Sequence, residues 1–133
     1  MPSLIDPGRA QSSGSQFDPL GLIAVVDDDS AVRHSLALVL SVIGRDAATF
    51  GSAADFLATD TASYSRILLD YHMPRMTGLE LAEHIRAEGY DTPIMLMSGG
   101  LTASIADKAS LLGIWKVHAK PVDLGKIREF IEA

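Results

Sequence analysis

The sequence has no cysteine, and it has no long hydrophobic run. The first absence excludes disulfide scaffolds, thiolate zinc sites and thiol nucleophiles. The second excludes a membrane-spanning helix, which needs about 18 consecutive apolar residues. The N-terminus also lacks the basic and then apolar order of a signal peptide. We therefore expect a soluble, cytoplasmic protein that makes no membrane contact.

Basic residues are also scarce. Eleven Lys and Arg stand against seventeen Asp and Glu, giving a formal charge of −6. This sign argues against direct binding of nucleic acid, whose affinity comes from neutralising phosphates. With 133 residues, 47% of them hydrophobic, the chain suits one folded domain.

Residues 1–20 differ from the rest of the chain. They are rich in proline, glycine and serine and show no hydrophobic period, so they cannot bury enough surface to offset the entropy of ordering. We expect a flexible N-terminal tail at 1–20 and one domain at 21–133. The alternative is a docking segment that folds on a partner, with Phe17 and Leu20 as anchors.

From Gly21 the chain alternates between short apolar runs and amphipathic segments. Leu22–Val26 is typical of a strand buried on both faces. After it, apolar residues recur at every third or fourth position until Gly44, which predicts a helix capped by Asp29 or Ser30. The same alternation predicts further strands at Ala47–Phe50, Arg66–Leu69, Ile94–Met97 and Val117–Ala119, and further helices at Ser52–Ala58, Thr77–Glu88, Ser104–Leu112 and Asp123–Ile131.

This order predicts an α/β fold, a doubly wound parallel sheet of five strands flanked by five helices. In such sheets the functional groups gather beyond the carboxyl ends of the strands. Polar residues stand at these ends: Asp27, Asp28 and Asp29 after the first strand, Asp70 after the third, Ser98 after the fourth and Lys120 after the fifth.

Gathered carboxylates repel one another unless a cation lies among them. Lys120 and a divalent metal ion would supply that charge. Oxygen ligands of this kind suit Mg²⁺, which commonly bridges carboxylates to phosphate oxygens. The strand ends therefore suggest phosphoryl chemistry.

The chain resembles the receiver domain of two-component response regulators over about residues 21–133. The resemblance rests on Val25-Val26-Asp27-Asp28, on Leu68-Leu69-Asp70-Tyr71-His72-Met73-Pro74-Arg75-Met76-Thr77-Gly78-Leu79-Glu80, on Met97-Ser98-Gly99 and on Lys120-Pro121. Each motif is weak alone, but their order and spacing are specific. The resemblance implies the flavodoxin-like fold with strand order 2-1-3-4-5.

The resemblance also implies catalytic roles. Asp70 would be the phosphoacceptor, attacking a phosphoryl group carried by a histidine and forming an aspartyl phosphate. Lys120 would pair with Asp70 and then with the phosphate, and Ser98 would donate its hydroxyl to a phosphoryl oxygen. Gly99 would leave room for the phosphodonor.

The metal ligands follow from the same resemblance. Asp28 and Asp70 would bind Mg²⁺ directly, Asp27 mainly through water, and His72 through its backbone carbonyl. The His72 ring is not expected to be a ligand. Three other histidines lack metal-ligand spacing and are expected to be surface or packing residues: His34, His84 and His118.

The expected partners are a histidine kinase or histidine phosphotransfer protein and a downstream protein target. The protein would be a self-phosphorylating and self-dephosphorylating signalling domain rather than a conventional enzyme. A stand-alone regulator, a phosphorelay intermediate and an excised N-terminal domain all fit the length. The oligomeric state, including a dimer formed on phosphorylation, stays open.

One position departs from the family pattern. Val117 stands three residues before Lys120, where an aromatic residue is common. A valine cannot repeat the rotation of an aromatic ring. Trp115 would lie on the same strand face if the strand extends that far, and could take over part of the output surface. The alternative is ordinary packing against a flanking helix.

Two other functions stay open. A haloacid-dehalogenase-like phosphohydrolase also has an apolar strand followed by Asp-x-Asp, here Asp27 to Asp29, but Ala31 stands where that motif expects Thr or Val. An adaptor with the receiver fold would signal without phosphorylation. The gathered acids argue against the adaptor, since a binding module does not need them.

Overall fold

The computed structural model describes residues 21–133, so the predicted tail and its candidate anchors Phe17 and Leu20 lie outside the described residues. Within this range, five parallel strands form one sheet in the order β2-β1-β3-β4-β5. The strands are β1 (Leu22–Val26), β2 (Ala47–Phe50), β3 (Tyr64–Asp70), β4 (Ile94–Ser98) and β5 (Lys116–Ala119). The α-helices are α1 (Ser30–Ile43), α2 (Ala53–Leu57), α3 (Gly78–Ala87), α4 (Ala103–Leu111) and α5 (Leu124–Glu132), and Thr61–Ser63 form a short 3₁₀ turn. The predicted fold class and strand order are confirmed.

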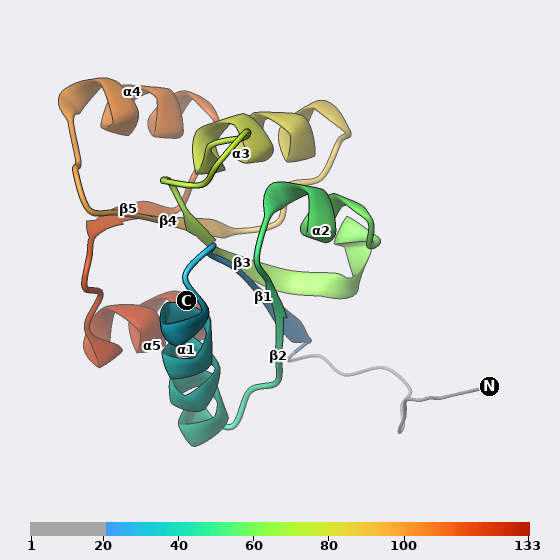
Figure 1. Ribbon diagram of the computed structural model, residues 1–133, viewed down its shortest axis with the longest axis vertical. Coiled ribbons are helices and arrows are strands. Elements are labelled where there is room, and N and C mark those ends of the chain that lie inside the picture. Colours follow the sequence, from blue (N-terminus) through green and yellow to red (C-terminus); the bar gives the residue numbers. More distant parts are fainter. Residues whose placement is uncertain (1–20) are drawn as a thin grey trace.

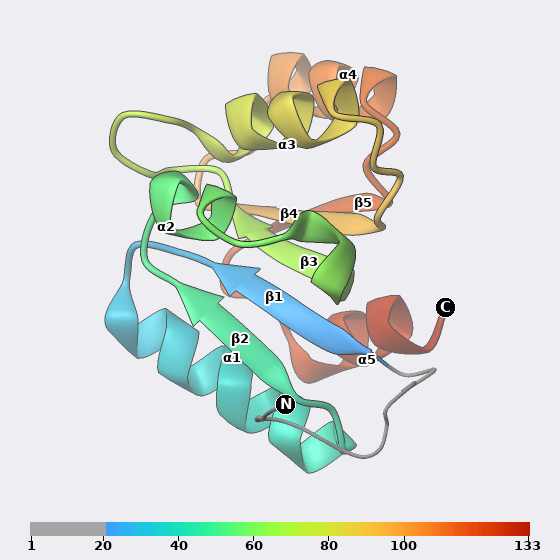
Figure 2. The ribbon, with the colours of Figure 1, turned by 90° about the vertical axis from the view of Figure 1, so that its right-hand side faces the viewer.

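Helices cover both faces of the sheet. Helices α1 and α5 lie on one face, and α2, α3 and α4 on the other (Figures 1 and 2). Strand side chains alternate between the two layers, as the pleat requires. On β1, Ile23 and Val25 pack towards α1 and α5, whereas Ala24 and Val26 pack towards the other layer. Both faces of the central strands are therefore core, which explains their continuous apolar sequences. In residues 21–133 no helix is long and apolar enough to cross a membrane.

Local signals set the helix ends. The Asp29 side chain accepts a hydrogen bond from the Ala31 N–H at 2.9 Å, so Asp29 is the N-cap of α1. Thr77 and Glu80 form a reciprocal capping box at the start of α3. Gly44, at φ 88°, ends α1 in the left-handed conformation. These caps confirm helix boundaries that the sequence predicts to within two residues.

Two partly buried arginines tie loops to the sheet. Arg66 on β3 donates to the Phe130 carbonyl at 3.0 Å near the C-terminal end of α5. Arg86 donates to four backbone carbonyls, which join the end of α3 to the segments before β4 and β5: Tyr90, Thr92, Leu112 and Gly113. Hydrogen bonds from a charged donor are stronger than those from a neutral donor. Both arginines therefore hold the connecting segments in place against the sheet.

The strand ends agree with the sequence prediction to within one residue except at the start of β3, and the orientation of one side chain also differs. Strand β3 begins at Tyr64 rather than Arg66, because Tyr64 pairs with Leu22 next to an irregularity in the register and is buried beside aromatic rings. Trp115 does not share a face with Val117. It precedes β5 and packs on Phe130 of α5, with ring centroids 5.2 Å apart, whereas Val117 packs in the layer of α3 and α4. The alternation fails because Trp115 lies outside the regular strand. The alternative, ordinary packing of Trp115 against a flanking helix, is confirmed.

Gly78 allows the first turn of α3 to pack closely against the end of β3. A Cβ atom at this position would collide with the backbone carbonyl of Asp70 and would lie 2.9 Å from Leu96 Cδ1. The Gly78 N–H donates to the Tyr71 carbonyl at 2.9 Å. The close approach therefore holds the segment that carries Asp70.

We predict that Gly78→Ala lowers the free energy of unfolding by about 2 kcal/mol, the usual cost of overpacking. Urea denaturation measures it. Gly99→Ala is the matched control, because its Cβ meets nothing within 4 Å. The control should be as stable as the wild type or slightly more stable. Equal stability of the two variants would contradict the packing role.

His118 lies on β5 and is partly buried. Its Nε2 is buried and has no hydrogen-bond partner within residues 21–133. Burial lowers the pKa of His118, the positive charges of Lys126 and Lys116 lower it further, and Glu129 and Asp123 act in the opposite direction. Protonation is therefore less favourable in the folded state than in the unfolded state.

Because the folded-state pKa of His118 is lowered, the protein should lose stability as pH falls below about 6.5, the unfolded value. We predict that His118→Leu reduces this loss between pH 7 and the lowered pKa, as measured by thermal unfolding at a series of pH values. His34→Leu, which removes an exposed histidine from α1, is the control. A reduction of the same size in the control would rule out the assignment to His118.

Candidate functional site

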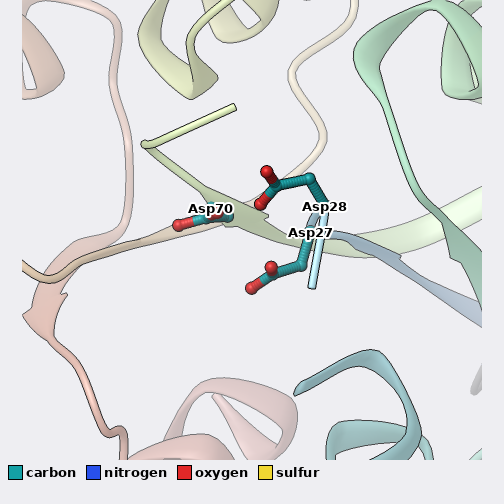
Figure 3. Close-up of side chains that lie close together, drawn as sticks. All are labelled: Asp27, Asp28 and Asp70. Atoms are coloured by element: carbon teal, nitrogen blue, oxygen red, sulfur yellow. The ribbon is translucent and has the colours of Figure 1, made fainter. Parts of the chain in front are cut away.

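Three carboxylates meet where β1 and β3 end. Asp27 and Asp28 follow β1, and Asp70 is the last residue of the neighbouring strand β3. One carboxylate oxygen from each lies within 4.8 Å of the others. Figure 3 shows these three side chains gathered at the ends of the two strands. Asp27 and Asp70 are buried, whereas Asp28 is exposed, so the group opens to solvent on one side.

Lys120, after β5, supplies a positive charge to this group. Its Nζ lies 2.8 Å from Asp27 Oδ2 and 3.0 Å from Asp70 Oδ1. The Lys120 backbone N–H donates to the Ser98 carbonyl at 2.9 Å, which fixes the start of the loop to β4. The Lys120–Pro121 peptide bond is cis. One ammonium therefore faces two buried carboxylates.

The pKa values reflect this imbalance. Burial raises the pKa of Asp70, and the charge of Asp27 adds to that effect, while Lys120 and a backbone hydrogen bond from His72 act against it. For Lys120, burial alone would lower the pKa, but its bonds to Asp27 and Asp70 outweigh burial and raise it. Lys120 therefore stays charged at neutral pH, and the ionised form of Asp70 is held at a cost.

The donor set fits a hard divalent cation. Asp70 Oδ1 is buried and receives no hydrogen bond of good geometry from residues 21–133, although the Lys120 ammonium lies near it. That ammonium is shared with Asp27 and offsets only one of three neighbouring carboxylate charges, so a further cation would be stabilised here. The available ligands are all oxygens, as Mg²⁺ prefers. The arrangement of these acids thus suits such an ion.

Asp27 is held differently from the other two acids. Its Oδ1 accepts from the Asp29 N–H at 2.9 Å and its Oδ2 accepts from Lys120 at 2.8 Å. Both oxygens of Asp27 are therefore engaged by groups of the chain. Asp29 caps α1 and points its carboxylate to the helix N–H groups, as a cap rather than a ligand.

The other predicted site residues lie around this group. Ser98 ends β4 and is buried, and its Oγ accepts from the Gly100 N–H at 3.2 Å. His72 follows Asp70 by two residues, is exposed, and stacks edge-on against Tyr71. His84 lies on α3, 3.4 Å from Glu88. The strand ends thus bring Asp27, Asp28, Asp70, Ser98 and Lys120 to one edge.

One residue beside the acids, Arg33, was not among those predicted from the sequence. Its Nη1 donates to the Asp27 carbonyl at 2.7 Å, and its guanidinium lies against Gly51 after β2. A signal was present, because a cation one turn into a helix opposes the positive end of the helix dipole.

Comparisons with known proteins agree with this geometry. The model of the response regulator receiver domain family matches residues 23–132. The chain belongs to this family. The receiver fold is shown as well by solved structures. A response regulator receiver protein from Pseudomonas putida has a TM-score of 0.78 and 32% identity, covering 84% of this chain and 95% of that one.

Two relatives show how far the similarity of this receiver domain extends. The transcriptional regulatory protein TdiR of Thauera aromatica is 34% identical over 100 residues, which cover 74% of this chain and 44% of TdiR. The Regulator of RpoS of Escherichia coli K12 is 36% identical over 115 residues, which cover 84% of this chain and 34% of that protein. The receiver domain therefore spans less than half of these relatives.

We predict that Asp70→Asn makes the receiver domain more stable at pH 7 in EDTA, because it removes a buried charge whose pKa is raised. The folded state of the wild type binds the Asp70 proton more strongly than the unfolded state does. The wild type therefore gains stability relative to the variant as pH falls through the raised pKa, and the difference shrinks. Urea unfolding at several pH values measures it.

The control for this prediction is Asp107→Asn, which neutralises an exposed acid on α4. It should change the free energy of unfolding little, as surface substitutions usually do. A lower stability of Asp70→Asn at neutral pH would mean that the ion pair with Lys120 outweighs burial, contrary to the expected balance.

Proposed function

We propose that this receiver domain accepts a phosphoryl group from a phosphohistidine onto Asp70, in a reaction that requires Mg²⁺. One observation carries the proposal. The Asp70 carboxylate is buried at the end of β3 beside two further acids, and the Lys120 ammonium near it is shared between Asp70 and Asp27. Such a carboxylate is placed to bind a cation and to attack an electrophile.

In the proposed step, an Asp70 carboxylate oxygen attacks the phosphorus of a phosphoimidazole. The new P–O bond forms as the P–N bond breaks, and the imidazole leaves with the bonding electron pair and takes up a proton from solvent. The carboxylate must be ionised to attack, and Lys120, 3.0 Å from Asp70 Oδ1, favours that form. Hydrolysis of the aspartyl phosphate by water returns the free carboxylate.

Mg²⁺ would be held by Asp28 and Asp70 directly, by Asp27 through water and by the His72 carbonyl. It supplies charge that offsets the negative charge on the phosphoryl oxygens. The support in this chain is the set of three carboxylate oxygens within 4.8 Å. Lys120 would move from Asp70 to a phosphate oxygen, and the buried Ser98 hydroxyl would donate to another.

The proposed output is a set of protein contacts that depend on phosphorylation. A histidine kinase or histidine phosphotransfer protein would supply the phosphoryl group, and a downstream protein would read it, in the cytoplasm. Val117 is packed in the layer of α3 and α4, and Trp115 on α5. Neither residue can act as the aromatic ring that usually moves at this position in the family. We therefore infer that the loop after Ser98 carries the conformational response to phosphorylation.

Intact-mass measurement of the full chain with acetyl phosphate and Mg²⁺ tests the proposed function. We predict that the wild type gains the mass of one phosphoryl group, that EDTA prevents the gain, and that Asp70→Ala abolishes it. Asp107→Ala, which removes an exposed acid outside the site, should gain the same mass as the wild type.

The alternatives predict different results. A phosphorylation-independent adaptor would gain no mass under any condition. A phosphohydrolase using Asp27 would turn over a generic phosphate ester, and this activity would survive Asp70→Asn but not Asp27→Asn. The structure favours neither alternative, because Asp27 is fully buried with both oxygens engaged and the acids lie around Asp70. Phosphoryl gain that persists in Asp70→Ala would overturn the proposal.

A further inference from the structure

We propose that Arg33 is a positioning residue that holds the Asp27–Asp28 peptide so that the Asp28 carboxylate faces the metal site. The inference rests on the proposed function, since it concerns the Mg²⁺ site, but it assigns a role to a residue outside that site's ligands. The observation that carries it is the 2.7 Å hydrogen bond from Arg33 Nη1 to the Asp27 carbonyl.

The bond acts on the peptide unit that orients Asp28. The Asp27 carbonyl and the Asp28 N–H belong to one planar group, so fixing the carbonyl fixes the direction in which the chain enters Asp28. The Asp27 N–H is already fixed, because it donates to the Phe50 carbonyl at 3.0 Å. Arg33 restrains the carbonyl group of Asp27, and the positive charge of Arg33 makes this hydrogen bond stronger than one from a neutral donor.

Asp28 depends on this backbone restraint more than the other two acids do. Asp27 is held by Lys120 and by the Asp29 N–H, and Asp70 is buried in the sheet. Asp28 is exposed, so packing does not fix its position. Its carboxylate reaches the others only if the end of β1 keeps its direction.

The placement of Arg33 serves this contact rather than the helix. Arg33 lies one turn into α1, where the positive end of the helix dipole disfavours a cation and the Asp29 N-cap only partly offsets that effect. The side chain turns back towards the strand ends and lies on Gly51, where a Cβ would be 3.2 Å from Nη1. It thus joins the segments after β1 and β2 beside the acids.

The direction of the effect separates positioning from simple electrostatics. If Arg33 acted only through its charge, removing it would strengthen Mg²⁺ binding, because one repelling cation would be lost. If it positions Asp28, removing it weakens binding. Loss of a residue that orients a metal ligand typically costs ten-fold or more in metal affinity, and the positioning effect then exceeds the electrostatic one.

The test is a titration of the full chain with MgCl₂, followed by backbone amide chemical shifts. We predict that Arg33→Met raises the Mg²⁺ dissociation constant about tenfold, whereas Arg33→Lys, which keeps a charged donor, recovers part of the affinity. Arg128→Met removes an exposed arginine, paired at 3.7 Å with Glu132 on α5, and controls for net charge. Unfolding in EDTA is measured for each variant.

The outcomes are distinct. An unchanged or lower dissociation constant in Arg33→Met, with or without lost stability in EDTA, would overturn the positioning role. Asp28→Asn is measured in parallel. If the wild type binds no Mg²⁺, or if Asp28→Asn binds it as tightly as the wild type, the proposed metal site itself fails. Weaker binding in both Asp28→Asn and Arg33→Met, but not in Arg128→Met, supports the inference.

Discussion

The repulsion among three carboxylates at one edge of the sheet is the constraint on which the rest of the site depends. Parallel strands β1 and β3 end side by side, so the sheet brings Asp27, Asp28 and Asp70 together in spite of their electrostatic repulsion. Lys120 offsets one of these charges, and its raised pKa shows how strongly the acids hold its proton. The remaining negative charge opposes folding, and the proposed Mg²⁺ would offset it.

The surrounding frame keeps the acids from relaxing apart. Gly78 lets α3 pack on the Asp70 carbonyl, and the Lys120 N–H is bonded to the Ser98 carbonyl. Strands buried on both faces leave these ends little freedom, because interiors are close-packed. Exposed Asp28 lacks such packing, so a polar contact from the chain, the bond from Arg33 to the Asp27 carbonyl, takes its place.

Most of this arrangement could be predicted from the sequence. The alternation of apolar strands and amphipathic helices predicts the parallel sheet. The polar residues at the strand ends are then the candidate site residues: Asp27, Asp28, Asp70, Ser98 and Lys120. The partners in two contacts could not be predicted because they depend on three-dimensional packing, although packing of Trp115 against a helix was one of two alternatives. Trp115 turns to Phe130 because it precedes the regular strand, and Arg33 reaches back along its helix to a carbonyl. Alternation along a strand and period along a helix describe neither.

The same charge balance bears on how a phosphoryl group would be sensed. An aspartyl phosphate carries close to two negative charges at neutral pH, so phosphorylation replaces the charge of Asp70 with a larger one at the same strand end. Lys120 is already within 3.0 Å of Asp70 and can follow the charge with little movement. The Ser98 hydroxyl accepts from the Gly100 N–H with a lone pair, so its proton is free to turn towards the phosphate. Ser98 would thereby link the phosphate to the backbone of the loop between β4 and α4, which we propose carries the response.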